Sequence, residues 1–331
     1  MTVRPDNRRM ATNYTPAMIA AATLLLLALI MVPFLADLFW LRVLSLSVMF
    51  AALAQATNLI AGFTGYAAFG NVVFFGIGSY ATGIVMVKAG GSFWLGLALA
   101  TVCPLILVMM VGPLLLRLRG HYFAIATVGL SEMIKAIISN LTPLTGGGNG
   151  LSLPIPQGSP AEVGIFFYLL LLTVLILATL VAIWFDRSRL GLACRAIRED
   201  ELKAEAMGLR TTAVKTIAWA LSAMLTGAVG GIYAYWFSYI EPPSVFDMLI
   251  SIKMFVMMLL GGAGTVMGPI IAAFALEYVS TLLWSRLLNF HTGALGLLVI
   301  LIVLFMPNGV VAFLRARLAA RPGHQGHRPE I

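Results

Sequence analysis

Charged residues are scarce in this chain. They make up 10% of the 331 residues, whereas 60% of the residues are hydrophobic. An average soluble domain is about 25% charged. A chain of this composition cannot hide its apolar surface in water, which excludes a soluble globular protein. Its apolar residues form continuous runs rather than alternating with polar ones, which argues against a β-barrel. We therefore predict an all-α, polytopic membrane protein.

Cysteine and the common catalytic motifs are equally scarce. The only cysteines are Cys103, in an apolar run, and Cys194, in a polar stretch, so we expect neither a disulfide nor a metal site. The sequence has no GxxxxGK[ST] phosphate loop, no HExxH and no CxxC. We expect no cofactor and no enzymatic activity, and any ATP that drives this protein is hydrolysed on another chain.

Apolar stretches of about 20 residues, the length that spans a bilayer, recur along the sequence. We predict about ten transmembrane helices, at 17–36, 42–61, 65–88, 93–116, 121–141, 163–185, 213–238, 246–265, 267–288 and 291–313. Glycines crowd the third stretch, which predicts either tight helix packing or a broken or re-entrant helix near 62–80.

Basic residues cluster in four places, and clusters of Lys and Arg mark the cytoplasmic side of a membrane. They lie in tail 1–16, at Arg117 and Arg119, in the polar stretch and in tail 314–331. Domain 17–313 then crosses the membrane, with loop 142–162 outside and both termini in the cytoplasm. The net charge of +8 is explained by this orientation, so no nucleic acid partner is expected.

The polar stretch Asp186–Lys215 holds seven basic and five acidic residues among thirty. It is long enough for one or two short helices with a charged face and an apolar face. We interpret it as a docking surface for a soluble partner, and the alternative is a solvated loop without a partner.

A few charged residues lie inside the predicted spans. Glu132 and Lys135 are three residues apart, which puts them on one helix face and close enough to pair. Lys253 and Glu277 have no partner that the sequence reveals. Charges inside a membrane usually face the bundle interior or an aqueous cavity. They therefore indicate either structural ion pairs or a polar path.

Four runs of this sequence, at 58–83, 117–151, 191–234 and 258–273, resemble the permease subunits of branched-chain amino acid ABC importers of the LivM type. The resemblance implies a pore subunit in the bacterial inner membrane. Its implied partners are a second homologous permease, two ATP-binding subunits, a periplasmic substrate-binding protein and membrane lipid. Permeases for urea or short-chain amides are closely similar, and a carrier driven by an ion gradient is the remaining alternative.

In such importers a cytoplasmic loop carries helices that couple the permease to the ATPases. Residues 186–212 correspond to that loop, and Glu205-Ala206-x-Gly208 resembles part of its EAA pattern, although Ile-x-Leu-Pro is absent. The polar and small coupling residues that we predict are Arg195, Ala196, Arg198, Glu201, Glu205, Ala206 and Gly208. We also expect Ile197, Leu202 and Met207 to pack into a groove of the ATPase, and the flanking spans six and seven to transmit its movement.

A substrate path for an amino acid needs an apolar wall with a few polar groups. The glycine-rich third span and the glycine-rich outer loop could supply both. The residues that we predict to lie along this path are Asn58, Gly65, Gly70, Asn71, Phe75, Gly76, Glu132, Gly147 and Asn149.

Overall fold

The computed structural model describes residues 29–33 and 37–286, and they form a helical bundle. Seven helical stretches there are long and apolar enough to cross a membrane, so the chain is a polytopic membrane protein as predicted. Every predicted span from 42–61 to 267–288 corresponds to a helix, whereas 291–313 and most of 17–36 lie outside the described residues. Seven of the main helices belong to these stretches: α2 (Leu38–Thr57), α3 (Val72–Val87), α4 (Phe93–Leu115), α5 (His121–Asn140), α7 (Pro160–Arg187), α10 (Thr211–Phe237) and α12 (Met248–Gly261). The eighth, α13 (Gly268–Arg286), has a shorter apolar part and is not counted among the seven.

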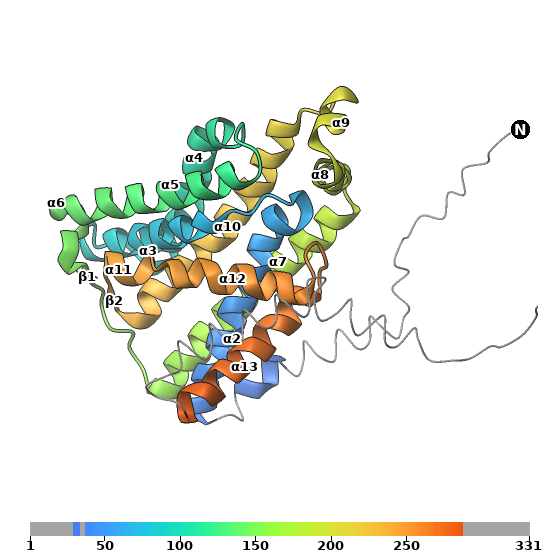
Figure 1. Cartoon of the computed structure of the whole chain (residues 1–331). Coiled ribbons are helices and arrows are strands. Elements are labelled where there is room, and N and C mark those ends of the chain that lie inside the picture. Colours follow the sequence, from blue (N-terminus) through green and yellow to red (C-terminus); the bar gives the residue numbers. More distant parts are fainter. Residues whose placement is uncertain (1–28, 34–36, 287–331) are drawn as a thin grey trace, which may run out of the picture.

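Short elements occupy two opposite ends of the bundle (Figure 1). One end holds α8 (Arg189–Glu199) and α9 (Glu201–Ala206), and the other holds strands β1 and β2 with α6. If the polar stretch and loop 142–162 face opposite sides of a membrane, as predicted, they must lie at opposite ends of the bundle. The arrangement in Figure 1 meets this requirement. The remaining short elements are η1 (Asn58–Gly62), η2 (Phe69–Asn71), α6 (Thr142–Thr145), η3 (Gly147–Asn149), β1 (Leu151–Ser152), β2 (Tyr239–Ile240) and α11 (Pro242–Val245).

Glycines let α10 approach its neighbours at backbone distance. A Cβ at Gly230 would lie 2.1 Å from the carbonyl oxygen of Phe75 in α3, and a Cβ at Gly227 would lie 2.2 Å from that of Ala100 in α4. The hydrophobic effect does not drive helices together in lipid, so close packing of this kind provides much of the free energy of their association. Gly227 and Gly230 are therefore positions of close helix packing in this structure.

The chain breaks its helix between α2 and α3. A π-helical turn, η1, extends α2, and residues 65–68 are not helical before η2 leads into α3. Gly65 has a φ of +76°, which a residue with a side chain rarely adopts. The residues outside regular α-helix or π-helix fall at 65–71, within the predicted range of 62–80. We call the stretch from η1 to η2, residues 58–71, the broken segment. It lies between two long helices rather than inside one.

Loop 142–162 is tied to the bundle. Its strand β1 pairs antiparallel with β2, with Leu151 opposite Ile240. Gly150, at φ +72°, passes so close that a Cβ there would lie 2.0 Å from the carbonyl oxygen of Ile240. Ser159 and Glu162 then form a capping box that starts α7. The loop is a folded link between α5 and α7.

Candidate coupling surface

The polar stretch folds into two helices, each started by its own cap. The Ser188 hydroxyl accepts a hydrogen bond from the amide of Gly191 at the start of α8, and the Asp200 carboxylate accepts one from Lys203 at the start of α9. Gly208, at φ +86°, follows α9 and turns the chain toward α10. The sequence therefore encodes this helix pair locally.

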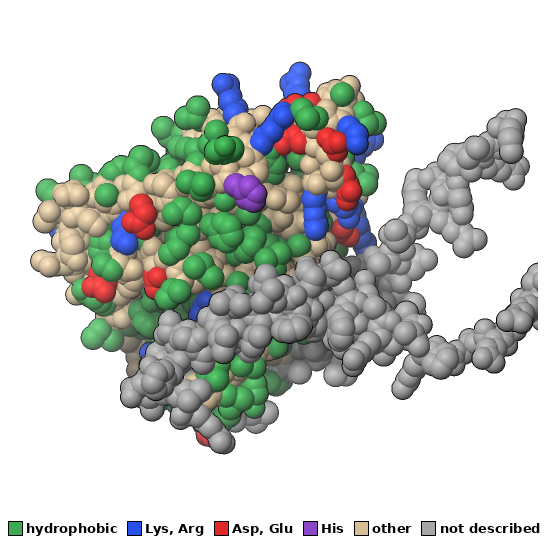
Figure 2. All heavy atoms as spheres, in the orientation of Figure 1, with side chains coloured by type: hydrophobic (Ala, Val, Ile, Leu, Met, Phe, Trp, Pro, Cys, Tyr) green, Lys and Arg blue, Asp and Glu red, His purple; other side chains and the backbone are tan. Residues whose placement is uncertain are grey.

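These helices present apolar side chains outward at the charged end of the molecule. The exposed fractions are 62% for Leu192, 63% for Leu202 and 85% for Met207. Ala196 and Ala206 are also exposed. Ile197 is only 3% exposed and packs inside the chain, so its predicted place in a partner's groove is wrong. Most of the charged side chains visible in Figure 2 gather around α8 and α9.

A buried lysine connects the helix pair to three other parts of the bundle. The Lys215 ammonium, 1% exposed, donates to Glu201 Oε1 of α9 at 2.6 Å. It also donates to the hydroxyl of Tyr66 in the broken segment and to the carbonyl of Leu116 just after α4, both at 2.9 Å. Tyr66 in turn donates to the second carboxylate oxygen of Glu201. All three donors of the ammonium are therefore used.

The Glu201 carboxylate remains ionised in this cluster. Burial by itself raises its pKa, but the hydrogen bonds from Lys215 and Tyr66 and the charges of Lys215 and Arg119 outweigh burial, and the pKa lies below its usual value. A carboxyl with a lowered pKa stabilises the fold above its unfolded pKa and loses this contribution as the pH falls through the lowered value. The Glu201 carboxylate therefore keeps its charge at neutral pH.

Arg119 and Glu205 extend the cluster toward solvent. The Arg119 guanidinium lies 3.0 Å from the Glu205 carboxylate and 3.9 Å from that of Glu201. The hydroxyl of Thr211 donates to the other oxygen of Glu205 at 2.9 Å. Separately, Arg195 pairs with Asp186 at 2.6 Å. Of the predicted polar coupling residues, Glu201 and Glu205 are thus held together, and Arg195 faces the end of α7.

Arg198 reaches in the opposite direction, into the bundle. Its guanidinium donates to the carbonyl of Gly62 in η1 at 2.8 Å and to that of Ala263 at 3.3 Å. Asn58 joins the same two segments, because its amide donates to the carbonyl of Thr265 and accepts from the amide of Gly264. The helix pair thus holds the broken segment and the turn between α12 and α13 directly, in addition to the flanking spans.

The predicted path residues do not line one passage within this chain. Most are buried in packed contacts: Asn58, Gly70, Asn71, Phe75, Gly76 and Gly147. Asn71, for example, accepts from the Trp219 indole at 3.0 Å and donates to the hydroxyl of Ser222 at 3.3 Å. The exposed ones are Gly65 near α8, Asn149 in η3 and Glu132 on α5.

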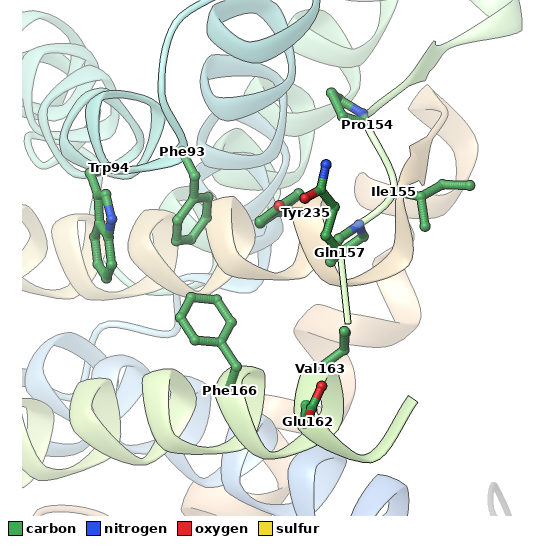
Figure 3. Close-up of a pocket in the computed structure, with 10 residues that line it drawn as sticks. Phe93, Trp94, Pro154, Ile155, Gln157, Glu162, Val163, Phe166 and Tyr235 are labelled. Carbon is green, nitrogen blue, oxygen red and sulfur yellow. The ribbon is translucent and has the colours of Figure 1, made fainter. Parts of the chain in front are cut away.

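A hollow of about 550 Å³ lies at the end of the molecule that holds β1 and β2, between the starts of α4 and α7 (Figure 3). Aromatic side chains form one side of it, where Phe93 and Trp94 face Phe166 across the gap. Gln157 and Glu162 supply its polar groups. None of the predicted path residues lines it. Aromatic residues of this kind are typical of the level where a membrane meets water.

The ion pair between the long helices α12 and α13 had no signal in the sequence. Lys253 of α12 lies 3.8 Å from the buried carboxylate of Glu277 in α13, 24 positions along the chain. The pair Glu132 and Lys135, which the spacing predicted, is present at 3.7 Å. Helical spacing reveals partners three or four residues apart and no others.

A bundle of apolar membrane-spanning helices, with a polar helix pair at one end, defines this chain as an integral membrane protein of the polytopic α-helical class. The family model described as branched-chain amino acid transport system, permease component, matches residues 39–306, and the chain belongs to that family.

Two curated relatives show how far the similarity extends. The chain is 29% identical over 305 residues to the high-affinity branched-chain amino acid transport system permease protein LivM of Salmonella typhimurium, covering 84% of this chain and 71% of the relative. It is 23% identical over 282 residues to the permease protein LivH of the same organism, covering 79% and 91%. No solved structure matches the chain.

Proposed function

We propose that this chain is a permease subunit of an ABC importer that moves branched-chain or related hydrophobic amino acids across the bacterial inner membrane. ATP is hydrolysed on two separate subunits in the cytoplasm, a periplasmic protein delivers the substrate, and a second homologous permease completes the pore. Family membership supports this assignment. The observation that carries it is the helix pair α8–α9, which turns Leu192, Leu202 and Met207 outward at the charged end of the molecule.

In this mechanism each ATPase subunit binds the helix pair of one permease. Leu202 and Met207 enter an apolar groove of the ATPase, with Ala196, Ala206 and Gly208 allowing close approach. Arg195, on the opposite flank, positions α8 through Asp186. Movement of the pair reaches the broken segment through Arg198, and α10 through Glu201 and Lys215.

Substituting Met207→Glu is expected to weaken binding of the ATPase subunits roughly thirtyfold, because central apolar contacts at interfaces are worth about 2 kcal/mol. Leu202→Glu should have the same effect. The control is Ile155→Glu in the outer loop, since Ile155 is 81% exposed, close to the 85% of Met207. Binding is measured by titrating purified ATPase subunits onto the detergent-solubilised permease pair. Equal binding by the Met207 and Ile155 variants contradicts the docking role.

Reconstitution tests the function as a whole. Vesicles that contain both permeases and both ATPases should accumulate radiolabelled leucine when the binding protein and ATP are supplied. Vesicles that contain this chain alone should accumulate none, with or without an ion gradient. Gradient-driven uptake by the chain alone identifies an ion-coupled carrier instead, and uptake of urea in place of leucine identifies an amide importer.

A further inference from the structure

One face of α5 is open along its whole length. Tyr122, Ile125, Gly129, Glu132 and Ala136 are all exposed, and their spacing of three and four residues puts them on a single helical stripe. A Cβ added at Gly129 would meet no atom within 4 Å in the part of the chain that the structure describes. We call these five residues the α5 stripe.

The charged residue of this stripe lies near the middle of a membrane span. Helix α5 has 20 residues, which corresponds to about 30 Å at a rise of about 1.5 Å per residue, the thickness of a hydrocarbon core. Glu132 lies about 2 Å from the midpoint of the helix on the same rise. It is too deep for its side chain to reach the water at either membrane surface.

Glu132 is also turned outward. Its side chain is 58% exposed and that of Lys135 is 30% exposed, and they are 3.7 Å apart. Charges at this depth face a protein interior or water, because lipid cannot solvate them. The open face of α5 therefore does not face lipid.

Two other helices, α4 and α7, have open faces without charged residues in the middle of the span. On α4 the exposed residues include Trp94, Ile106 and Met110, and the sequence of this helix contains no charged residue. On α7 the exposed residues include Leu177 and Leu180, and its charged residues lie only in the first and last turns. Those faces suit lipid, and of these three helices only α5 turns a charged residue outward in the middle of its span.

The other side of α5 holds the broken segment. The amide of Gly70 donates to the hydroxyl of Thr127 at 3.2 Å, and a Cβ at Gly70 would lie 1.8 Å from the carbonyl oxygen of Thr127. Substrate sites of transporters commonly lie near the midplane beside interrupted helices. Helix α5 thus stands between the interrupted helix and the open side of the bundle.

We propose that the α5 stripe lines the water-filled translocation path and that Glu132 and Lys135 bind the charged head of a zwitterionic amino acid there. Glu132 accepts from the substrate's ammonium, and Lys135 donates to its carboxylate. Their own contact, at 3.7 Å, is longer than a hydrogen bond and leaves donors and acceptors available. Ile125 and Tyr122 give the aliphatic side chain an apolar wall. This inference rests on the proposed importer function and names the substrate contact.

Thiol labelling in the assembled complex tests the path. Glu132→Cys and Gly129→Cys are introduced singly into a chain carrying Cys103→Ala and Cys194→Ala, and Met110→Cys on the apolar face of α4 is the control. A charged, membrane-impermeant methanethiosulfonate should label the two stripe variants at least about tenfold faster, because each unit by which lipid raises a thiol pKa lowers the reactive thiolate tenfold. Leucine-loaded binding protein with ATP should slow this labelling.

Two labelling results overturn the proposal. If the stripe variants label no faster than Met110→Cys, both in the isolated chain and in the complex, the face lies against lipid. If they label rapidly in the isolated chain but not in the complex, the second permease covers the face. Leucine uptake by the unmodified complex is measured in the same vesicles, so failure of the importer function is detected separately from failure of the path.

Uptake tests the substrate contact. Glu132→Gln should lower the rate of leucine uptake about tenfold, the effect of losing a hydrogen bond between charged groups, while ATPase binding stays unchanged. The exchanged variant Glu132→Lys/Lys135→Glu keeps both charges and should recover part of the rate, since a zwitterion can bind in the reverse sense. Uptake by Glu132→Gln at the unmodified rate shows that the pair does not contact substrate.

Discussion

Lys215→Met is expected to lower the melting temperature of the assembled complex and to abolish the stimulation of ATP hydrolysis by loaded binding protein. The substitution leaves the Glu201 carboxylate, which is 13% exposed, without its closest cation, and Arg119 remains at 3.9 Å. Removing one partner of a buried ion pair typically costs about 3–5 kcal/mol. It also removes the three hydrogen bonds that the Lys215 ammonium makes, to Glu201 of α9, to the hydroxyl of Tyr66 and to the carbonyl of Leu116 at the end of α4. Thermal unfolding and stimulated ATPase activity are the two measurements.

A second variant separates stability from coupling. In Lys215→Met/Glu201→Met both charges are gone, and replacing a buried ion pair by apolar residues is often neutral for stability. The melting temperature should recover while the stimulated ATPase activity stays low. Lys203→Met is the matched control, because Lys203 is 83% exposed and its pair with Asp200 is a surface contact worth about 0–1 kcal/mol. An unchanged melting temperature in Lys215→Met contradicts the role assigned to this cluster.

Gly230→Ala is expected to prevent close packing of α3 against α10. The added methyl would lie 2.1 Å from the carbonyl oxygen of Phe75, more than an ångström short of the 3.4 Å at which ordinary contact begins. The obstacle is backbone, so no side chain can rotate away, and the helices must separate. Overpacking of this kind costs about 1–3 kcal/mol or more. The hydrogen bond from the Ser79 hydroxyl to the carbonyl of Gly230, at 2.9 Å, would also be disturbed.

The measurement is the yield of folded, monodisperse protein after extraction from membranes, together with its melting temperature. Gly112→Ala in α4 is the control, because a Cβ there would meet only side-chain atoms, the nearest at 3.3 Å. We expect the control to behave as the unmodified protein does and Gly230→Ala to lose most of its folded yield. Equal yields and melting temperatures for the two variants would falsify the backbone-contact account.

Local patterns were enough to place much of the fold. Runs of apolar residues placed the long helices that the structure describes, because spanning length is set by bilayer thickness. The helix pair in 186–212 was predictable since Ser188 and Asp200 start helices by local capping. Leu202 and Met207 are exposed, which is what residues predicted to enter a groove of a partner require. The error at Ile197 has a simple cause: an apolar residue on an amphipathic helix packs either inward or outward, and spacing alone does not decide which.

For the candidate substrate path, local sequence patterns were not enough to decide the role of each residue. Glycine enrichment at 62–78 was ambiguous between packing and a path, and the structure assigns Gly70 and Gly76 to packing against Thr127 and Phe246. Asn58 and Asn71 each donate one hydrogen bond and accept one within the chain. Burial of one residue depends on every helix around it, so the sequence pattern of one span could not separate these alternatives.

The sequence by itself determined that this protein resides in a membrane, how its spans follow one another and where its polar helices form. Each of these depends on residues that are neighbours in the chain. Only the tertiary structure decided which partners the charged residues find among residues far away in the chain. Glu201 accepts hydrogen bonds from Lys215 and Tyr66, Arg198 donates to the carbonyl of Gly62, and Lys253 pairs with Glu277. These partners are brought together by helix packing, and packing depends on contacts between residues that are far apart in the sequence.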